Sequence, residues 1–264
     1  MSNDDLPLLE RFTLFFDFLG TADAATSWPK ERLYPFLDLL ISLAHVESVE
    51  DISGTAQENG SYRITITPEV TTFSDNIVVS YPSVPDEGPP GDRFKSFWAK
   101  IVCEDAIRIL SAVAEMGLRI GVLIRGGFSF GQLYHENGVV FGEAMVDAYQ
   151  LENTHAVHPR VLVSERIIEK LTGLPEAELT FLLKDTDGRW HLDYFAEMIR
   201  HSSNGPIDDE HARRWKCAHL KTIDTTINAA TTLGDTGVRE KWALGLVAFA
   251  ILLLVREPQD LIPL

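Results

Sequence analysis

The sequence is poor in cysteine and in positive charge. Only two cysteines occur among its 264 residues. Cys103 and Cys217 are too few for a disulfide framework and lack metal-ligand spacing, as expected of buried thiols in a cytoplasmic protein. The 23 Lys and Arg are outnumbered by 39 Asp and Glu, which gives a formal net charge of −16. An acidic surface repels nucleic acid and anionic lipid, so neither is an expected partner. A small phosphorylated ligand is not excluded, because a metal ion can neutralise its charge.

Long hydrophobic runs are also missing. The one candidate, Trp242 to Val255, has no charged residue, but it is shorter than the roughly 20 apolar residues that a membrane span needs. This favours a buried or subunit-interface helix over a membrane anchor. The first residues, MSNDDL, are acidic where a signal peptide is basic, so we expect a cytoplasmic protein.

Hydrophobic patterning predicts an alternation of strands and helices. The aromatic run Phe12 to Leu19 is too short for a helix and predicts a buried strand. Prolines and glycines in 82–92 predict a loop, and 68–75 is expected to connect two strands. The other expected elements are a helix over 27–44, strands at 62–67 and 76–81, a helix over 93–116, a strand at 119–130, a hairpin turn at 135–138, a helix over 142–151, a strand at 161–163, a helix from 164 and a hairpin over 178–195.

This order predicts an α+β sandwich of the ferredoxin-like type, with helices on one face of a mostly antiparallel sheet. We place its boundary near residue 200 and expect residues 201–264 to form a separate C-terminal helical region. The sequence contains no internal repeat that would favour another architecture.

Two aspartates stand out by their surroundings. Asp17 lies near the end of an apolar strand, and Asp75 immediately precedes another. A buried carboxylate needs a partner, and two that converge at one sheet edge would suit Mg²⁺ or Mn²⁺, which prefer oxygen ligands. The alternative is that Asp17 caps a turn and Asp75 caps a hairpin.

The residues after Asp17 favour the metal site. Leu19, Gly20 and Thr21 follow the strand at the approach to a helix, where glycine permits a sharp turn and free backbone amides can bind anions. A metal-binding aspartate next to such amides would suit a triphosphate.

Four motifs, in this order and spacing, resemble the catalytic core of the class III nucleotidyl cyclases. They are FFDFLG, FSDN, RGGFSFG and FGEAMVDAYQLE. The resemblance extends over about residues 12–163 and implies a cyclase catalytic domain within residues 1–200. The RGG strand and the FSDN form are most similar to the pyrimidine cyclases of bacterial Pycsar antiphage defence, which make cyclic UMP or cyclic CMP.

The resemblance implies a two-metal phosphoryl transfer within one nucleoside triphosphate. Asp17 and Asp75 would hold two Mg²⁺ or Mn²⁺ ions, and the backbone carbonyl of Phe18 would complete one coordination shell. The amides of Leu19, Gly20 and Thr21 would bind the β- and γ-phosphates. The expected substrate is UTP, with CTP as the second choice.

Class III sites form between two catalytic domains, so the resemblance also implies a homodimer with sites at its interface. The partner chain would supply a base pocket from Phe15, Thr71 and Val139. Phe15 could stack on the base or belong to the core. Thr71 replaces a lysine of the purine cyclases, and Val139 replaces a residue that is commonly acidic in adenylate cyclases.

The sequence departs from the family at the transition-state pair. The expected asparagine and arginine fall on Val146 and Gln150, so another cation must stabilise the developing charge on phosphorus. Arg125, in the RGG strand, is the best candidate because a guanidinium binds phosphate oxygens bidentately; its alternative role is an ion pair with a carboxylate. An adenylate or guanylate cyclase and a non-catalytic, nucleotide-binding module remain the competing hypotheses.

Overall fold

The computed structural model describes residues 8–19, 21, 24–44, 50–56, 60–84, 92–120, 122–156, 159–185, 187–194 and 197. The expected C-terminal helical region, 201–264, and Cys217 lie outside these residues. The described elements are β1 (Leu9–Leu19), α1 (Ala24–Ser27), α2 (Lys30–Ala44), β2 (Glu50–Ala56), β3 (Gly60–Ile66), β4 (Glu69–Phe73), β5 (Asn76–Pro82), α3 (Asp92–Arg119), β6 (Leu123–Glu136), β7 (Val139–Phe141), α4 (Glu143–Gln150), a π-helical turn (Leu151–His155), β8 (Val161–Val163), α5 (Glu165–Leu171), a 3₁₀ turn (Glu176–Glu178), β9 (Leu182–Lys184) and β10 (Trp190–Leu192).

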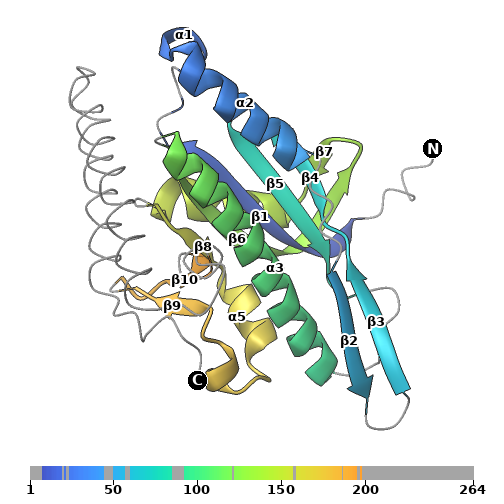
Figure 1. Cartoon of the computed structure of the whole chain (residues 1–264). Coiled ribbons are helices and arrows are strands. Elements are labelled where there is room, and N and C mark those ends of the chain that lie inside the picture. The colour runs from blue at the N-terminus through green and yellow to red at the C-terminus, as the bar shows by residue number, and fades with distance from the viewer. Residues whose placement is uncertain are drawn as a thin grey trace, which may run out of the picture.

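The main sheet has the strand order β4-β5-β1-β6-β8-β10-β9, with β7 attached to β6. Strands β4, β5, β1 and β6 pair antiparallel, and α2 and α3 each connect two of them that are not neighbours (Figure 1). This is the split βαβ arrangement of the ferredoxin-like sandwich, which confirms the predicted fold class. The single parallel pair, β6 with β8, extends the sheet beyond this unit.

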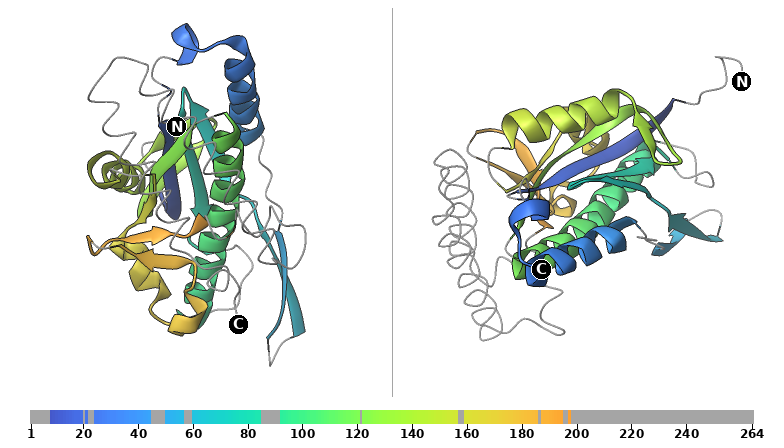
Figure 2. Two further views of the ribbon diagram at one scale, coloured as in Figure 1. Left: turned by 60° about the vertical axis from the view of Figure 1, so that its left-hand side comes forward. Right: turned by 90° about the horizontal axis from the view of Figure 1, so that it is seen from above.

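Strand β1 runs through the middle of the sheet, and both of its faces are covered. Its alternate residues point to opposite faces: Phe18 packs edge-on against Phe36 of α2, whereas Phe15 packs edge-on against Tyr149 of α4. Figure 2 shows α2 and α3 on one side of the sheet and α4 on the other. The expectation that all helices share one face is therefore wrong for α4.

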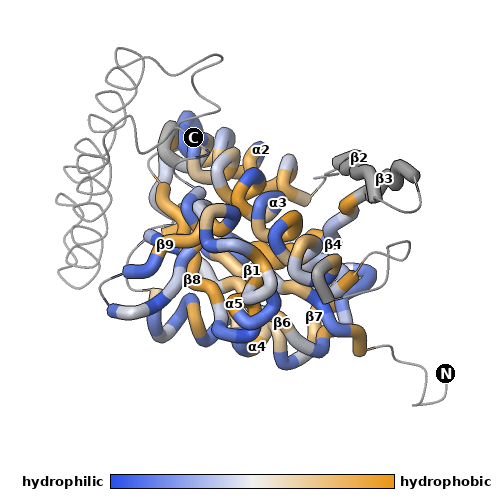
Figure 3. Tube along the Cα trace, turned by 90° about the horizontal axis from the view of Figure 1, so that it is seen from below, coloured by the Kyte–Doolittle hydropathy of each residue, from blue (hydrophilic) through white to orange (hydrophobic). Residues whose placement is uncertain are grey.

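The larger core lies between the sheet and the helices α2, α3 and α5, and the apolar stretches in Figure 3 gather where these elements pack together. Trp98 of α3 is fully buried there, and its indole donates a hydrogen bond to the carbonyl of Pro82. Cys103 is a free, buried thiol in this core, as predicted. The smaller core under α4 consists of Phe15, Val78 and Ala148, with Val140 and Met145 at its edge.

The RGG pair explains how α4 approaches the sheet so closely. A Cβ atom on Gly127 would lie 2.2 Å from the carbonyl oxygen of Ala148 in α4, and one on Gly126 would lie 2.4 Å from the carbonyl oxygen of Phe15. Real side chains do not tolerate such contacts, so only glycine fits here. At this glycine pair, the close approach is thus made by protein backbone.

The segment between the predicted strands at 62–67 and 76–81 differs from expectation. It contains a strand, β4, that pairs with β5 to form the hairpin. Strand β3 pairs instead with β2 in a separate two-stranded sheet. No helix among the described residues is long and apolar enough to cross a membrane; the run Trp242 to Val255 lies outside them.

Candidate active site

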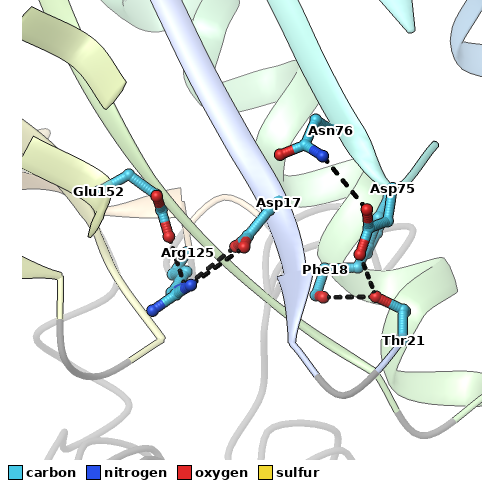
Figure 4. A network of polar contacts seen from close by, with 7 residues as sticks. All are labelled: Asp17, Phe18, Thr21, Asp75, Asn76, Arg125 and Glu152. Carbon is cyan, nitrogen blue, oxygen red and sulfur yellow. Dashed lines mark hydrogen bonds and ion pairs between the residues drawn. The ribbon is translucent and has the colours of Figure 1, made fainter. Parts of the chain in front are cut away.

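The sheet brings Asp17 and Asp75 together. Asp17 lies on β1 opposite Asn76 of β5 and opposite Arg125 of β6. Asp75 lies in the tight β4–β5 turn, directly before Asn76, whose amide donates a 3.2 Å hydrogen bond to it. Figure 4 shows Asp17 on β1 with its carboxylate turned toward Arg125, and Asp75 beside Thr21 and Asn76. The pairing of β1 with β5 therefore places Asp75 one position before the residue that faces Asp17, and a metal site shared by the two carboxylates stays a prediction.

The pKa of Asp17 is raised above its ordinary value. Burial is the main cause, the neighbouring Arg125 opposes it, and the negative charge of Asp75 adds to the rise. A cation bound at Asp17 would offset both the burial of this carboxylate and its repulsion by Asp75.

Thr21 joins Asp75 to the backbone carbonyl of Phe18. Its buried hydroxyl lies 2.8 Å from that carbonyl oxygen and also makes a short contact with Oδ2 of Asp75. A hydroxyl has one hydrogen and can satisfy only one of these two acceptors. The carbonyl of Phe18 and the carboxylate of Asp75 therefore surround one point and retain unused acceptor capacity.

Arg125 is held by two carboxylates. Its Nε and Nη2 atoms each lie 3.1 Å from a different oxygen of Asp17, and Nε lies 2.6 Å from Oε1 of Glu152 (Figure 4). In this conformation the guanidinium forms the ion pair that was the alternative role for Arg125.

Glu152 is a site residue to which the sequence alone assigns no role. It lies on the π-helical turn that continues α4, its side chain is 3% exposed, and burial together with the charge of Asp17 raises its pKa to about 7 against the opposing effect of Arg125. The sequence feature that could have pointed to Glu152 is the Leu-Glu pair at the end of the FGEAMVDAYQLE motif. A single sequence does not show that this glutamate faces Asp17.

The three expected base-pocket residues lie in different surroundings. Phe15 is 2% exposed and belongs to the core under α4, which was its alternative role. Thr71 is half-buried on β4, where its hydroxyl lies 2.9 Å from Nε2 of His135. Val139 is exposed at the start of β7, next to Val140, which pairs with His135. His135 thus brings the Thr71 and Val139 regions together.

The expected phosphate-binding segment is described in part. Leu19 is the last residue of β1 and pairs with Leu123, Gly20 lies outside the described residues, and Thr21 contacts Phe18 and Asp75 through its hydroxyl. The carbonyl of Thr21 accepts a hydrogen bond from the amide of Ala24, which begins α1.

The donors at this site fit a hard divalent cation by type. Two carboxylates and one backbone carbonyl are oxygen ligands, which Mg²⁺ and Mn²⁺ prefer, and Mg²⁺ usually keeps several positions for water or phosphate. Among the residues described, no group of three or more His, Cys, Asp and Glu side chains could enclose a metal ion. A cation held by these oxygen atoms would need further ligands from water or from a bound phosphate.

Comparisons with known proteins add little to this geometry. No protein-family model and no curated protein matches the chain. Among solved structures, the crystal structure of the guanylyl cyclase Cya2 matches with a TM-score of 0.32 and 12% identity, covering 69% of this chain and 91% of that one. A likeness at this level carries no argument about activity, which depends on the site residues themselves.

Proposed function

We propose that this protein is a nucleotidyl cyclase that converts a pyrimidine nucleoside triphosphate, UTP in preference to CTP, into its 3′,5′-cyclic monophosphate and pyrophosphate. The observation that supports the proposal is the position of Asp75 next to the carbonyl of Phe18, with Asp17 on the same end of β1 and opposite the residue that follows Asp75. The resemblance to the Pycsar enzymes supports a role for the product as a second messenger in antiphage defence.

Asp17, Asp75 and the Phe18 carbonyl would hold two Mg²⁺ or Mn²⁺ ions. When bound, these ions would lower the pKa of the ribose 3′-hydroxyl and neutralise the triphosphate. In the reaction, the 3′-oxygen forms a bond to the α-phosphorus while the bond from that phosphorus to the bridging oxygen breaks. Pyrophosphate leaves with the electron pair, and the hydroxyl proton passes to water. The protein contributes position and charge rather than covalent chemistry.

Arg125 would have one role in the empty site and another when a cation and substrate are bound. Without substrate it neutralises Asp17 and Glu152, as in Figure 4. Once a cation takes over Asp17, the guanidinium is released on that side and can bind the phosphate oxygens that gain charge in the transition state. Glu152 would then retain it near the site.

A second copy of this chain is the expected partner. Apolar side chains are exposed on the outer side of α4 and on β7, and four of them leave about half or more of their surface open. They are Val139, Phe141, Val146 and Tyr149. A homodimer through this surface would cover them and place the base-pocket residues of one chain near the aspartates of the other.

The test is incubation of the purified protein with each of the four nucleoside triphosphates and Mn²⁺, with products separated by chromatography. Cyclic UMP and pyrophosphate are the expected products. Asp17→Ala should abolish turnover and keep the folded state, because it removes a ligand and no core packing. Asp38→Ala, on the exposed side of α2, is the matched control and should remain active. A folded protein that yields no cyclic product from any triphosphate would refute the proposal.

A non-catalytic nucleotide-binding module is the second candidate. The occurrence of Val146 and Gln150 at the positions of the family's asparagine and arginine favours it. Its signature would be nucleotide binding by calorimetry without release of pyrophosphate. Formation of cyclic AMP or cyclic GMP in the same assay would instead indicate a purine cyclase.

A further inference from the structure

The Nε atom of Arg125 lies between two carboxylates, but its single hydrogen is given to only one of them. That hydrogen forms the 3.1 Å bond to Oδ1 of Asp17. Oε1 of Glu152 lies nearer, at 2.6 Å, in an ion pair that lacks hydrogen-bond geometry. Among the described residues this oxygen has no hydrogen-bond partner, although the Glu152 side chain is 3% exposed. Glu152 therefore holds an unused acceptor at contact distance from Arg125 (Figure 4).

The two carboxylates compete for the same hydrogen. Nε of an arginine carries one hydrogen, so the arrangement that satisfies Asp17 withholds the bond from Glu152. A buried carboxylate oxygen without a hydrogen bond is unfavourable, because no water replaces the missing donor. A small rotation of the guanidinium would give the hydrogen to Glu152 instead, since Nε and Oε1 are already in contact.

The backbone that carries Glu152 is held at both ends of the π-helical turn. At its start, a Cβ atom on Gly127 would lie 2.7 Å from Cβ of Leu151, so only glycine permits this approach to β6. At its end, Nη2 of Arg160 donates a 3.0 Å hydrogen bond to the carbonyl of His155. Arg160 is itself held by ion pairs with two aspartates of the β9–β10 turn. The guanidinium, and not Glu152, is therefore the group that can turn between the two carboxylates.

We infer that Glu152 is the second docking position of Arg125, to which the guanidinium turns when a divalent cation occupies Asp17. The oxygens of Asp17 are then engaged by the cation, and the Nε hydrogen satisfies Oε1 of Glu152, so Nε keeps one hydrogen bond throughout. Nη2, which contacts Oδ2 of Asp17 in this structure, becomes free for phosphate oxygens. Glu152 is thus a positioning residue that acts through Arg125. The inference rests on the part of the proposed function that places a cation at Asp17, and not on the choice of nucleotide.

Glutamine separates this role from a simple effect of charge. A buried carboxylate near Asp17 attracts any cation, whether or not it accepts a hydrogen bond. Glutamine has no charge but keeps a side-chain oxygen that can accept from Nε, whereas alanine has neither. Glu152→Gln therefore retains the second docking position, and Glu152→Ala abolishes it.

The experiment measures the affinity for Mn²⁺ by calorimetry without nucleotide, at pH 8, where Glu152 with its raised pKa of about 7 is ionised. Glu152→Ala should bind Mn²⁺ about tenfold more weakly than the wild type, because the displaced guanidinium has no buried acceptor to receive it. Glu152→Gln should recover most of this affinity. Glu143→Ala, which removes an exposed glutamate of α4, is the matched control and should keep the wild-type affinity. Equal weakening in Glu152→Ala and Glu152→Gln, or no change in either, would overturn the inference.

Removing Arg125 tests whether Glu152 acts through it. In Arg125→Ala no guanidinium is displaced, so adding Glu152→Ala or Glu152→Gln should have the same effect on Mn²⁺ affinity. A difference between the two that persists without Arg125 would show that Glu152 acts directly on the cation and would overturn the inference.

Nuclear magnetic resonance can follow the hydrogen itself in protein labelled with ¹⁵N-arginine. The Nε hydrogen of Arg125 should exchange slowly with water before and after saturation with Mg²⁺, because it turns from one buried acceptor to another. In Glu152→Ala it should exchange rapidly once Mg²⁺ is bound. Rapid exchange in the Mg²⁺-bound wild type would contradict the second docking position.

The outcomes separate this inference from the proposed function. Formation of a cyclic nucleotide together with equal effects of the two Glu152 variants overturns the inference alone. The expected order of Mn²⁺ affinities without any cyclic product refutes the cyclase and supports the inference. A folded protein that binds neither Mn²⁺ nor Mg²⁺ overturns both.

Discussion

Arg125 and Asp17 form a two-point ion pair in which each carboxylate oxygen contacts a different guanidinium nitrogen at 3.1 Å. Both oxygens of Asp17 are thereby engaged by a cation that belongs to the protein. A divalent ion at Asp17 must displace this guanidinium or share the carboxylate with it. Arg125, which is proposed to bind the phosphates, therefore also competes with the metal ion for the carboxylate of Asp17.

Replacing Arg125 should separate these two roles. We expect Arg125→Ala to bind Mn²⁺ more tightly in calorimetry, because the competing cation is removed and the site becomes more negative. The same variant should lose about a hundredfold or more in turnover, since the developing phosphate charge loses its partner. Arg166→Ala, which breaks an exposed ion pair with Glu143, is the control and should change neither property. Weaker binding of Mn²⁺ by Arg125→Ala would contradict the competition.

The sequence was sufficient to predict that Asp17 and Asp75 belong to neighbouring parts of the sheet, because Asp17 lies near the end of one apolar strand and Asp75 directly precedes another. The sequence was not sufficient to predict which carboxylates pair with Arg125. Its partner Glu152 lies 27 positions further along the chain on a π-helical turn, and a sequence pattern does not reveal which carboxylate a helix turns toward the sheet.

Strand β4 was missed for a similar reason. Residues 69–73 carry a glutamate and two threonines, so their local hydrophobicity is that of a connection. Their pairing with β5 depends on the turn at Ser74 and Asp75 and on the sheet beyond it. Strand pairing is decided by such tertiary contacts more than by local preference.

Gly127 should be the glycine of the RGG pair that sets the position of α4. In Gly127→Ala the new methyl group would meet the carbonyl of Ala148, so we expect a loss of about 1–3 kcal/mol in the free energy of unfolding measured with urea. Activity should fall as well, because a displaced α4 would also move Glu152 on the π-helical turn that follows it. Ser129→Ala, two residues further on the same strand face, removes a buried hydroxyl with no hydrogen-bond partner among the described residues and should leave stability unchanged or slightly higher.

The exposed apolar surface of α4 and β7 should decide the oligomeric state. Phe141 leaves 71% of its surface open, and a charge placed there would be desolvated in a dimer interface. We expect Phe141→Glu to be a monomer by light scattering and to be inactive, because each site would lack its base pocket. Leu37→Glu, at an exposed apolar residue of α2, is the control and should remain dimeric and active. A fully active Phe141→Glu monomer would exclude a site shared between two chains.

His135 should make folding sensitive to acid. Its pKa falls from 6.5 to about 4 in the folded protein, mainly through burial and secondly through the charge of Arg11. Between these values the unfolded chain binds a proton that the folded protein does not, so stability is complete above pH 6.5 and is lost as the pH falls toward 4. The loss from this residue should reach up to about 3 kcal/mol.

The measurement is the free energy of unfolding in urea at pH 7 and at pH 4.5, for the wild type and for His135→Gln. Carboxylates contribute the same pH dependence to both proteins, so their difference isolates the imidazole. Glutamine can keep one hydrogen bond to Ser80 or Thr71 but does not titrate, and its stability should fall less in acid. If the two proteins lose the same free energy between these pH values, the imidazole of His135 is not held neutral by its burial.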